Sequence, residues 1–146
     1  MRDSNLGIPT NVIAVVAGKV LGYKMIATST YSFTFAEVLA FGALTQDNQP
    51  IHSIEGIVQA GLVLATLPKL GFLAPEIREI LTTGAMTVGI ESKFRHPIRA
   101  HQTLITTFTV DKITGPMLKL HFTITCDDNV CCEGIWKVLK TQDSGA

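Results

Sequence analysis

The segment Phe35 to His52, FAEVLAFGALTQDNQPIH, places a carboxylate and an imidazole just beyond an amphipathic run. Pro50 fixes its own φ and disfavours the helical conformation at Gln49, so the chain must leave the preceding helix and turn before His52. That turn lets Asp47 and His52 converge on one water, as acid and base or as base and orienter. The same residues also suit an ordinary helix exit with a packed histidine, and alone they favour that interpretation.

The helix before this turn has a marked start. Thr34-Phe35-Ala36-Glu37 is a capping box, in which the Thr34 hydroxyl accepts a backbone N–H and the Glu37 carboxylate reaches back. Such a cap typically stabilises a helix by ~1 kcal/mol. The apolar residues Phe35, Val38 and Leu39 share one helical face. Asp47 is therefore expected just beyond a short buried helix.

The whole segment resembles the hydratase motif of the MaoC-like (R)-specific enoyl-CoA hydratases. In that family an aromatic and small-residue helix ends in Asp, followed by two residues that usually include Asn, then Pro, an aliphatic residue and His. Asp47, Pro50 and His52 match this motif, and the family's usual Asn is Gln49 here. The resemblance implies an α+β hot-dog fold, with a curved antiparallel sheet around a central hydrophobic helix.

Residues 1–146 are expected to form a single hot-dog domain, and the polar start of the chain, residues 1–10, a loose N-terminal arm. The central helix would come from Ile57 to Leu70, which is nearly all apolar, because a helix apolar on every side must be enclosed. Pro68 inside this run predicts a kink or an early end. Ser92 to Ile98 and Cys132 to Trp136 also resemble strand segments of the family.

The amino end of this helix carries the second candidate site. The family opens its central helix with His-Gly, which corresponds to Ala60-Gly61 here. Free N–H groups and the positive end of the helix dipole can hold a thioester oxygen as charge develops on it. Gly61 would let a ligand approach the backbone closely, although tight helix packing explains a glycine equally well.

The spacing also separates this chain from a sister group. Only Ser53 to Gln59 lies between His52 and Ala60, so the family's usual lid segment is shortened. Similar spacing is typical of acyl-carrier-protein dehydratases, which place a catalytic Glu five residues after the Gly. That position is Thr66 here, and Thr cannot replace an acidic proton donor. Asp47 remains the only matched acid.

Composition sets further limits. Hydrophobic residues make up 47% of the 146 residues, charged residues 16%, and the mean hydropathy is +0.33, so we expect some surface to pair with another subunit. The resemblance implies that this assembly is a homodimer. Twelve basic and twelve acidic residues cancel, and without a basic cluster we expect no nucleic acid partner. Val12 to Leu21 is too short to span a bilayer and is no obvious targeting signal, so no membrane partner is expected. Whether it is helix or strand stays open.

The cysteines and remaining histidines have ordinary explanations. An odd number of cysteines, Cys126, Cys131 and Cys132, suggests free thiols and a reducing, cytoplasmic location. No histidine pair has zinc-like spacing, so we expect no metal. His121 is expected on the exposed face of its strand. Lys93, Arg95 and Arg99 could meet CoA phosphates, but scattered cations are usually solvated.

Strand signals dominate the second half of the chain. Leu118 to Cys126 alternates apolar and polar residues, and turns are expected at Thr114 to Pro116 and Asp127 to Asn129. Together these features predict an antiparallel meander. The further expected elements are an extended segment from Tyr23 to Ser32, a short helix from Leu73 to Leu81, and strands in 86–94, 104–110 and 130–139.

The resemblance implies reversible syn addition of water to a trans-2-enoyl thioester without a cofactor. Asp47 and His52 would be catalytic and the Gly61 N–H would polarise the thioester carbonyl. The substrate would be an acyl-CoA or an acyl-carrier thioester. Two alternatives stay open, a hot-dog acyl-CoA thioesterase and a non-catalytic module that binds acyl thioesters.

Overall fold

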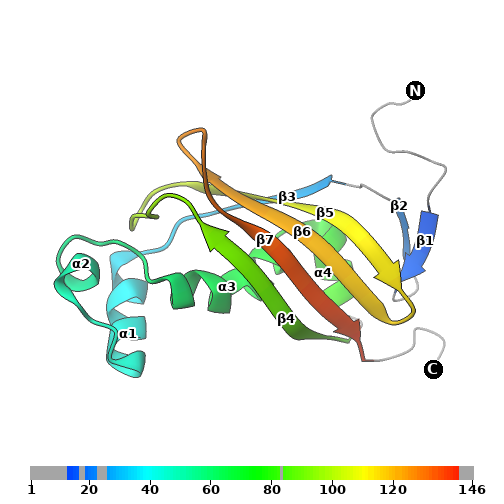
Figure 1. Cartoon of the computed structure of the whole chain (residues 1–146), viewed down its shortest axis with the longest axis horizontal. Helices are drawn as coiled ribbons and strands as arrows, with labels where there is room; N and C mark the ends of the chain where they lie inside the picture. The colour runs from blue at the N-terminus through cyan, green and yellow to red at the C-terminus, as the bar shows by residue number, and fades with distance from the viewer. Residues whose placement is uncertain (1–12, 17–18, 23–25, 83, 142–146) are drawn as a thin grey trace.

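A computed structural model describes residues 13–16, 19–22, 26–82 and 84–141. Its main sheet has five antiparallel strands in the order β3-β5-β6-β7-β4, so β3 and β4 are the edges. The strands are β3 (Ile26–Tyr31), β4 (Ala85–Phe94), β5 (Leu104–Thr114), β6 (Met117–Cys126) and β7 (Asn129–Lys140). Figure 1 shows a long curved sheet with helices α3 and α4 against one face and α1 and α2 beyond one end.

The strand pattern read from the sequence is confirmed. Buried and half-buried residues alternate strictly along β6, and Leu118, Leu120 and Phe122 point into the core. The β6–β7 turn uses Asp127 and Asp128, both with positive φ, which is the backbone of a type I′ hairpin turn. The two hairpins β5–β6 and β6–β7 form the predicted meander, and β4 then joins the far side of β7.

In the described part of the chain, four helices lie between β3 and β4. They are α1 (Phe35–Thr45), α2 (Pro50–Ser53), α3 (Ala60–Phe72) and α4 (Pro75–Thr82). The capping box is present, with the Glu37 N–H donating to Thr34 Oγ1 and the Thr34 N–H donating to Glu37 Oε1. Tyr31 also donates to Glu37 Oε2 over 2.5 Å, which ties β3 to the start of α1.

One expectation about the central helix is wrong, and a second is wrong in part. It is buried on one side through Val63, Leu67 and Leu70, while Ala60, Gly61, Ala65 and Pro68 are exposed, so the sheet does not enclose it on every side. The helix also runs through Pro68 to Phe72, so the predicted early end is wrong, while a kink at Pro68 stays a prediction. Proline removes only one backbone hydrogen bond there, and the buried residues on both sides of it hold the helix against the sheet.

The prediction of three free thiols is also wrong. Cys126 and Cys131 form a disulfide across the β6–β7 hairpin, and only Cys132 is free. The pairing register shifts next to Cys131, so Cys131 and Cys132 are both buried instead of alternating between faces. A cytoplasmic location stays a prediction, but its argument from free thiols no longer holds.

The segment whose conformation the sequence left open forms two strands. β1 (Ile13–Val16) pairs with β2 (Lys19–Gly22) in a separate antiparallel sheet. The arm predicted for residues 1–10 lies outside the described residues. Within the described ranges, no single helix is long and apolar enough to cross a membrane. The pair α3 and α4, bent by 96° at the break between them, meets that criterion by length and composition.

Candidate functional site

Both polar side chains of the motif, Asp47 and His52, follow a left-handed residue at the end of α1. α1 ends at Thr45, and Gln46 follows with φ 62°, a conformation that stops the helix. Pro50 then opens α2, where its missing N–H and fixed φ suit the first helical position. The predicted exit before His52 is therefore observed, and His52 sits on a one-turn helix.

The structure brings Asp47 and His52 together. His52 Nε2 lies 3.5 Å from Asp47 Oδ1, and the side chains are 15% and 39% exposed. On the other side of the ring, His52 Nδ1 lies 2.7 Å from the Ile57 carbonyl oxygen. A carbonyl oxygen only accepts hydrogen bonds, so Nδ1 carries the proton and donates. In its neutral form, the imidazole then presents an unprotonated Nε2 to the Asp47 carboxylate.

This arrangement favours a bridging donor between the two groups. A neutral Nε2 and a carboxylate oxygen both accept hydrogen bonds, and 3.5 Å exceeds the usual N–H···O range of about 2.7–3.2 Å. A water that donates to both would be held and polarised at once. The pair can therefore orient a water and remove one of its protons, which is the chemistry of a general base with an orienting partner.

The third predicted residue, Gly61, lies in the first turn of α3. Gly61 is exposed, and the N-cap residue Gln59 makes no side-chain hydrogen bond to the first N–H groups of this helix. A Cβ on Gly61 would lie 3.1 Å from Cζ of Phe41 on α1. The side of Gly61 that faces α1 is thus occupied by a ring, which supports the packing interpretation of this glycine.

The sequence interpretation missed Gln59. Its side chain is fully buried and its Nε2 donates to two main-chain carbonyls, that of Val38 at 3.0 Å and that of Asp47 at 3.1 Å. One amide group therefore connects the start of α3 to α1 and to the turn that carries the candidate acid. The only sequence signal was a polar residue at the start of an apolar run.

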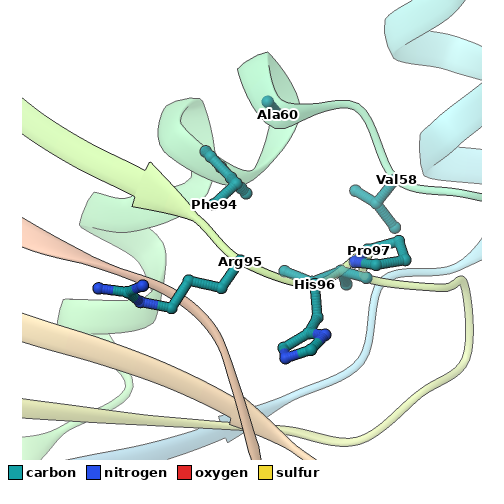
Figure 2. A pocket seen from close by; sticks show the side chains of 7 residues that line it. Val58, Ala60, Phe94, Arg95, His96 and Pro97 are labelled. Carbon is teal, nitrogen blue, oxygen red and sulfur yellow. The ribbon is translucent and has the colours of Figure 1, made fainter.

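Two pockets flank the segment between His52 and α3. The first, of about 260 Å³, lies at the start of α3, where Val58 and Ala60 face residues from the end of β4, as Figure 2 shows. Its lining is Val58, Ala60, Phe94, Arg95, His96, Pro97 and Ile98. The second, of about 450 Å³, is lined by Phe35, Ile54, Glu55, Gly56, Arg99, Ala100 and His101. Neither pocket is lined by Asp47 or His52.

The other charged candidates take separate places. Arg95 lines the first pocket and pairs with Glu133, Arg99 lines the second, and Lys93 is exposed on β4. His121 is half-buried, not exposed as expected. Thr66 donates from Oγ1 to the Leu62 carbonyl within α3. Among the described residues, no group of three His, Cys, Asp or Glu side chains is arranged to hold a metal ion.

Comparison with known proteins gives structural similarity only. No protein-family model and no curated protein sequence matches the chain. An (R)-hydratase from A. caviae involved in PHA biosynthesis is similar with a TM-score of 0.70 and 20% identity, covering 82% of this chain and 97% of that one. R-hydratase PhaJ1 from Pseudomonas aeruginosa is similar with a TM-score of 0.60 and 16% identity, over 90% and 89% of the two chains.

Thioesterases share the same architecture. A mutant of the fluoroacetyl-CoA-specific thioesterase FlK has a TM-score of 0.65 at 9% identity and covers 82% of this chain and 87% of that one. At these identities the similarity establishes the fold, and the chemistry has to be argued from the site. The five-stranded curved sheet and its helix α3 give this chain the hot-dog fold that those hydratases and thioesterases also have.

Proposed function

We propose that the protein adds water reversibly to trans-2-enoyl thioesters, giving (R)-3-hydroxyacyl thioesters. The observation that carries this proposal is the His52–Asp47 pair, with Nε2 and Oδ1 3.5 Å apart and the imidazole fixed by the Ile57 carbonyl. The (R)-hydratases that share the fold support it, and the motif from Asp47 to His52 adds the resemblance in sequence.

In the proposed mechanism, Asp47 and His52 hold one water between them. The water oxygen forms a bond to C3 of the enoyl thioester while His52 Nε2 or the Asp47 carboxylate removes one water proton. The electron pair of the C2–C3 double bond shifts to C2 and the thioester oxygen. A proton is then returned from the pair to C2, on the face that the water attacked, which makes the addition syn. The net reaction consumes one water and needs no redox partner.

The Gly61 N–H has the second role in this proposal. It belongs to the first turn of α3, where backbone N–H groups have no intrahelical acceptor. An N–H there would donate to the thioester oxygen as negative charge develops. Removing one such donor typically costs ~2.7–4 kcal/mol of transition-state stabilisation.

The direct test mixes purified protein with trans-2-butenoyl-CoA and with trans-2-octenoyl-CoA and follows loss of the conjugated enoyl absorbance. Coupling to dehydrogenases specific for each 3-hydroxyacyl stereoisomer then identifies the product. Loss of absorbance with an (R)-product supports the proposal. An (S)-product, or no loss from either substrate with the fold intact by circular dichroism, contradicts it.

A thioesterase is the second candidate, because FlK and a putative thioesterase from Pseudomonas aeruginosa have the same fold. In that reaction the same water would attack the thioester carbon and release free CoA. Free thiol from a saturated acyl-CoA, detected with a thiol reagent, distinguishes it from the hydratase. Binding of acyl-CoA without any product would instead indicate the non-catalytic module.

We further propose that the protein forms a homodimer. The edge strand β4 exposes Met86 and Val88 at 49% and 45%, and the far end of α3 exposes Phe72 at 45%. A sheet edge with exposed apolar side chains is a ready surface for pairing with another strand. Light scattering after gel filtration should give twice the chain mass. Val88→Lys should shift it toward the monomer, and unchanged mass would contradict this use of β4.

A further inference from the structure

The buried amide of Gln59 has an unusual set of partners. Its Nε2 donates to the carbonyls of Val38 and Asp47, so the amide orientation is fixed, because carbonyl oxygens accept only. The remaining Oε1 is buried and has no hydrogen-bond partner in the structure. A buried acceptor without a donor is unfavourable, and an apolar side chain of the same size would avoid it. The two bonds to carbonyls are thus what this glutamine contributes at position 59.

Those two bonds fix the turn that carries Asp47. Val38 lies inside α1, and the Asp47 carbonyl belongs to the turn after that helix, so one side chain holds both to the start of α3. The space around the turn is already tight, because a Cβ on Gly42 would lie 3.1 Å from the same Asp47 carbonyl oxygen. The Asp47 backbone is therefore held from two sides, by Gly42 and by Gln59.

The position of Gln59 also affects the helix that it precedes. Gln59 is the N-cap residue of α3, where Ser, Thr, Asp or Asn would usually accept from the first N–H groups. Its side chain makes no such bond and turns away to α1 and Asp47. The first N–H groups of α3, including that of Gly61, are consequently left uncapped by it.

We infer that Gln59 is a positioning residue, which anchors the Asp47 turn to the uncapped start of α3 and so fixes the distance between the acid–base pair and the oxyanion donor. This inference rests on the proposed function for its kinetic consequences. Its structural part, the anchoring of the Asp47 turn, is independent of the proposed function. Gln59 does not act on the substrate in this scheme; it acts through Asp47 and through the free N–H groups of α3.

Two substitutions separate anchoring from packing. Gln59→Leu keeps the volume and removes both hydrogen bonds. Gln59→Asn keeps the amide but is one methylene shorter, so it no longer reaches both carbonyls and suits a conventional N-cap that would occupy the N–H groups. Ile77→Val is the control, because it trims a buried side chain on α4, away from α1 and the Asp47 turn.

The first readout is hydrogen–deuterium exchange of the peptide covering residues 42–49, which needs no activity. Faster exchange in Gln59→Leu and Gln59→Asn, but not in Ile77→Val, is the expected result. Unchanged exchange in both Gln59 variants would overturn the inference, whether or not the protein is a hydratase. If the wild type fails to hydrate enoyl-CoA while exchange behaves as expected, the proposed function fails and the anchoring stands.

The second readout is the split between kcat and KM. A displaced catalytic group lowers kcat by about 10²-fold, whereas a merely destabilised but folded protein keeps its turnover. We expect kcat to fall in both Gln59 variants with KM within about twofold, since the substrate's remote contacts are untouched. Ile77→Val should keep wild-type kcat below its melting temperature. Wild-type kcat in Gln59→Asn would overturn the positioning role.

Discussion

Phe41 on α1 fills the space where a side chain at Gly61 would begin, with its Cζ 3.1 Å from the position of a Cβ there. Helix α1 therefore contacts the first turn of α3 at the residue proposed to bind the thioester oxygen. The glycine serves this packing, and its N–H remains at the exposed start of the helix.

Gly61→Ala should consequently separate packing from helix propensity. Alanine favours a helix over glycine by roughly 0.5–1 kcal/mol, while a ring that must yield costs about 1–3 kcal/mol. We expect a small net loss, about 1 kcal/mol, in the free energy of unfolding measured with urea. Hydratase activity of the folded protein should also fall, by more than the loss of stability explains, because the start of α3 shifts. Full activity would contradict a shift at the start of α3.

Asp47→Asn and His52→Ala should each lower kcat by ~10²–10⁴-fold, the usual size of general acid–base catalysis. Neither change should unfold the protein, since Asp47 is 39% exposed and His52 contributes one bond, to the Ile57 carbonyl. The measurement is the enoyl-CoA absorbance assay alongside thermal unfolding. His121→Ala is the matched control, because His121 lies on β6 and lines neither pocket. A fully active Asp47→Asn protein would exclude this site.

Glu37 makes the stability of the fold depend on pH. Partial burial opposes ionisation of this carboxyl, but hydrogen bonds from Tyr31 and from Thr34 outweigh it and lower its pKa below 4.5. A lowered pKa in the folded state means that the stabilisation is complete above about 4.5 and is lost as pH falls through the folded value. The free energy of unfolding measured with urea should therefore fall more steeply from pH 6 to pH 3 in the wild type than in Glu37→Gln. Parallel slopes would contradict this role.

The number of reactive thiols tests the state of the three cysteines. Unfolded without reductant, the chain should expose one reactive thiol, Cys132, and after reduction three. In the native state even Cys132 should resist alkylation at pH 8, because burial, with Glu133 adding to it, raises its pKa to about 11. Reducing the disulfide should cost about 2 kcal/mol of stability for so short a loop. Three thiols before reduction would disprove the Cys126–Cys131 bond.

Gly134 on β7 is the most constrained glycine of the sheet. A Cβ there would lie 1.8 Å from the Glu91 carbonyl oxygen, which is backbone and cannot rotate away. Gly134→Ala should destabilise the fold by about 3 kcal/mol or more, since the β4–β7 pairing must move apart. Gly89→Ala on β4 is the control, because its nearest atom is the Lys137 side chain at 3.5 Å. Similar melting temperatures for both variants would contradict this pairing.

The sequence predicted those elements whose cause is local. The capping box at Thr34, the alternation along β6 and the turn at Asp127 depend on residues next to one another, and all three are observed. The exit of α1 before Pro50 follows equally from local sterics. The motif also brought Asp47 and His52 into the candidate site before any distance was known.

Tertiary structure decided whatever depends on contacts between distant segments. The Cys126–Cys131 bond follows from a register shift in β7 that no spacing rule indicates. The exposed side of α3 depends on how far the sheet curves. The continuation of this helix through Pro68 depends on the burial of the neighbouring residues. The anchoring of Asp47 by Gln59 joins residues twelve positions apart through a main-chain carbonyl, an atom that every residue has. The amino-acid sequence therefore determined which groups are available, and the packing of distant segments against one another determined which of them meet.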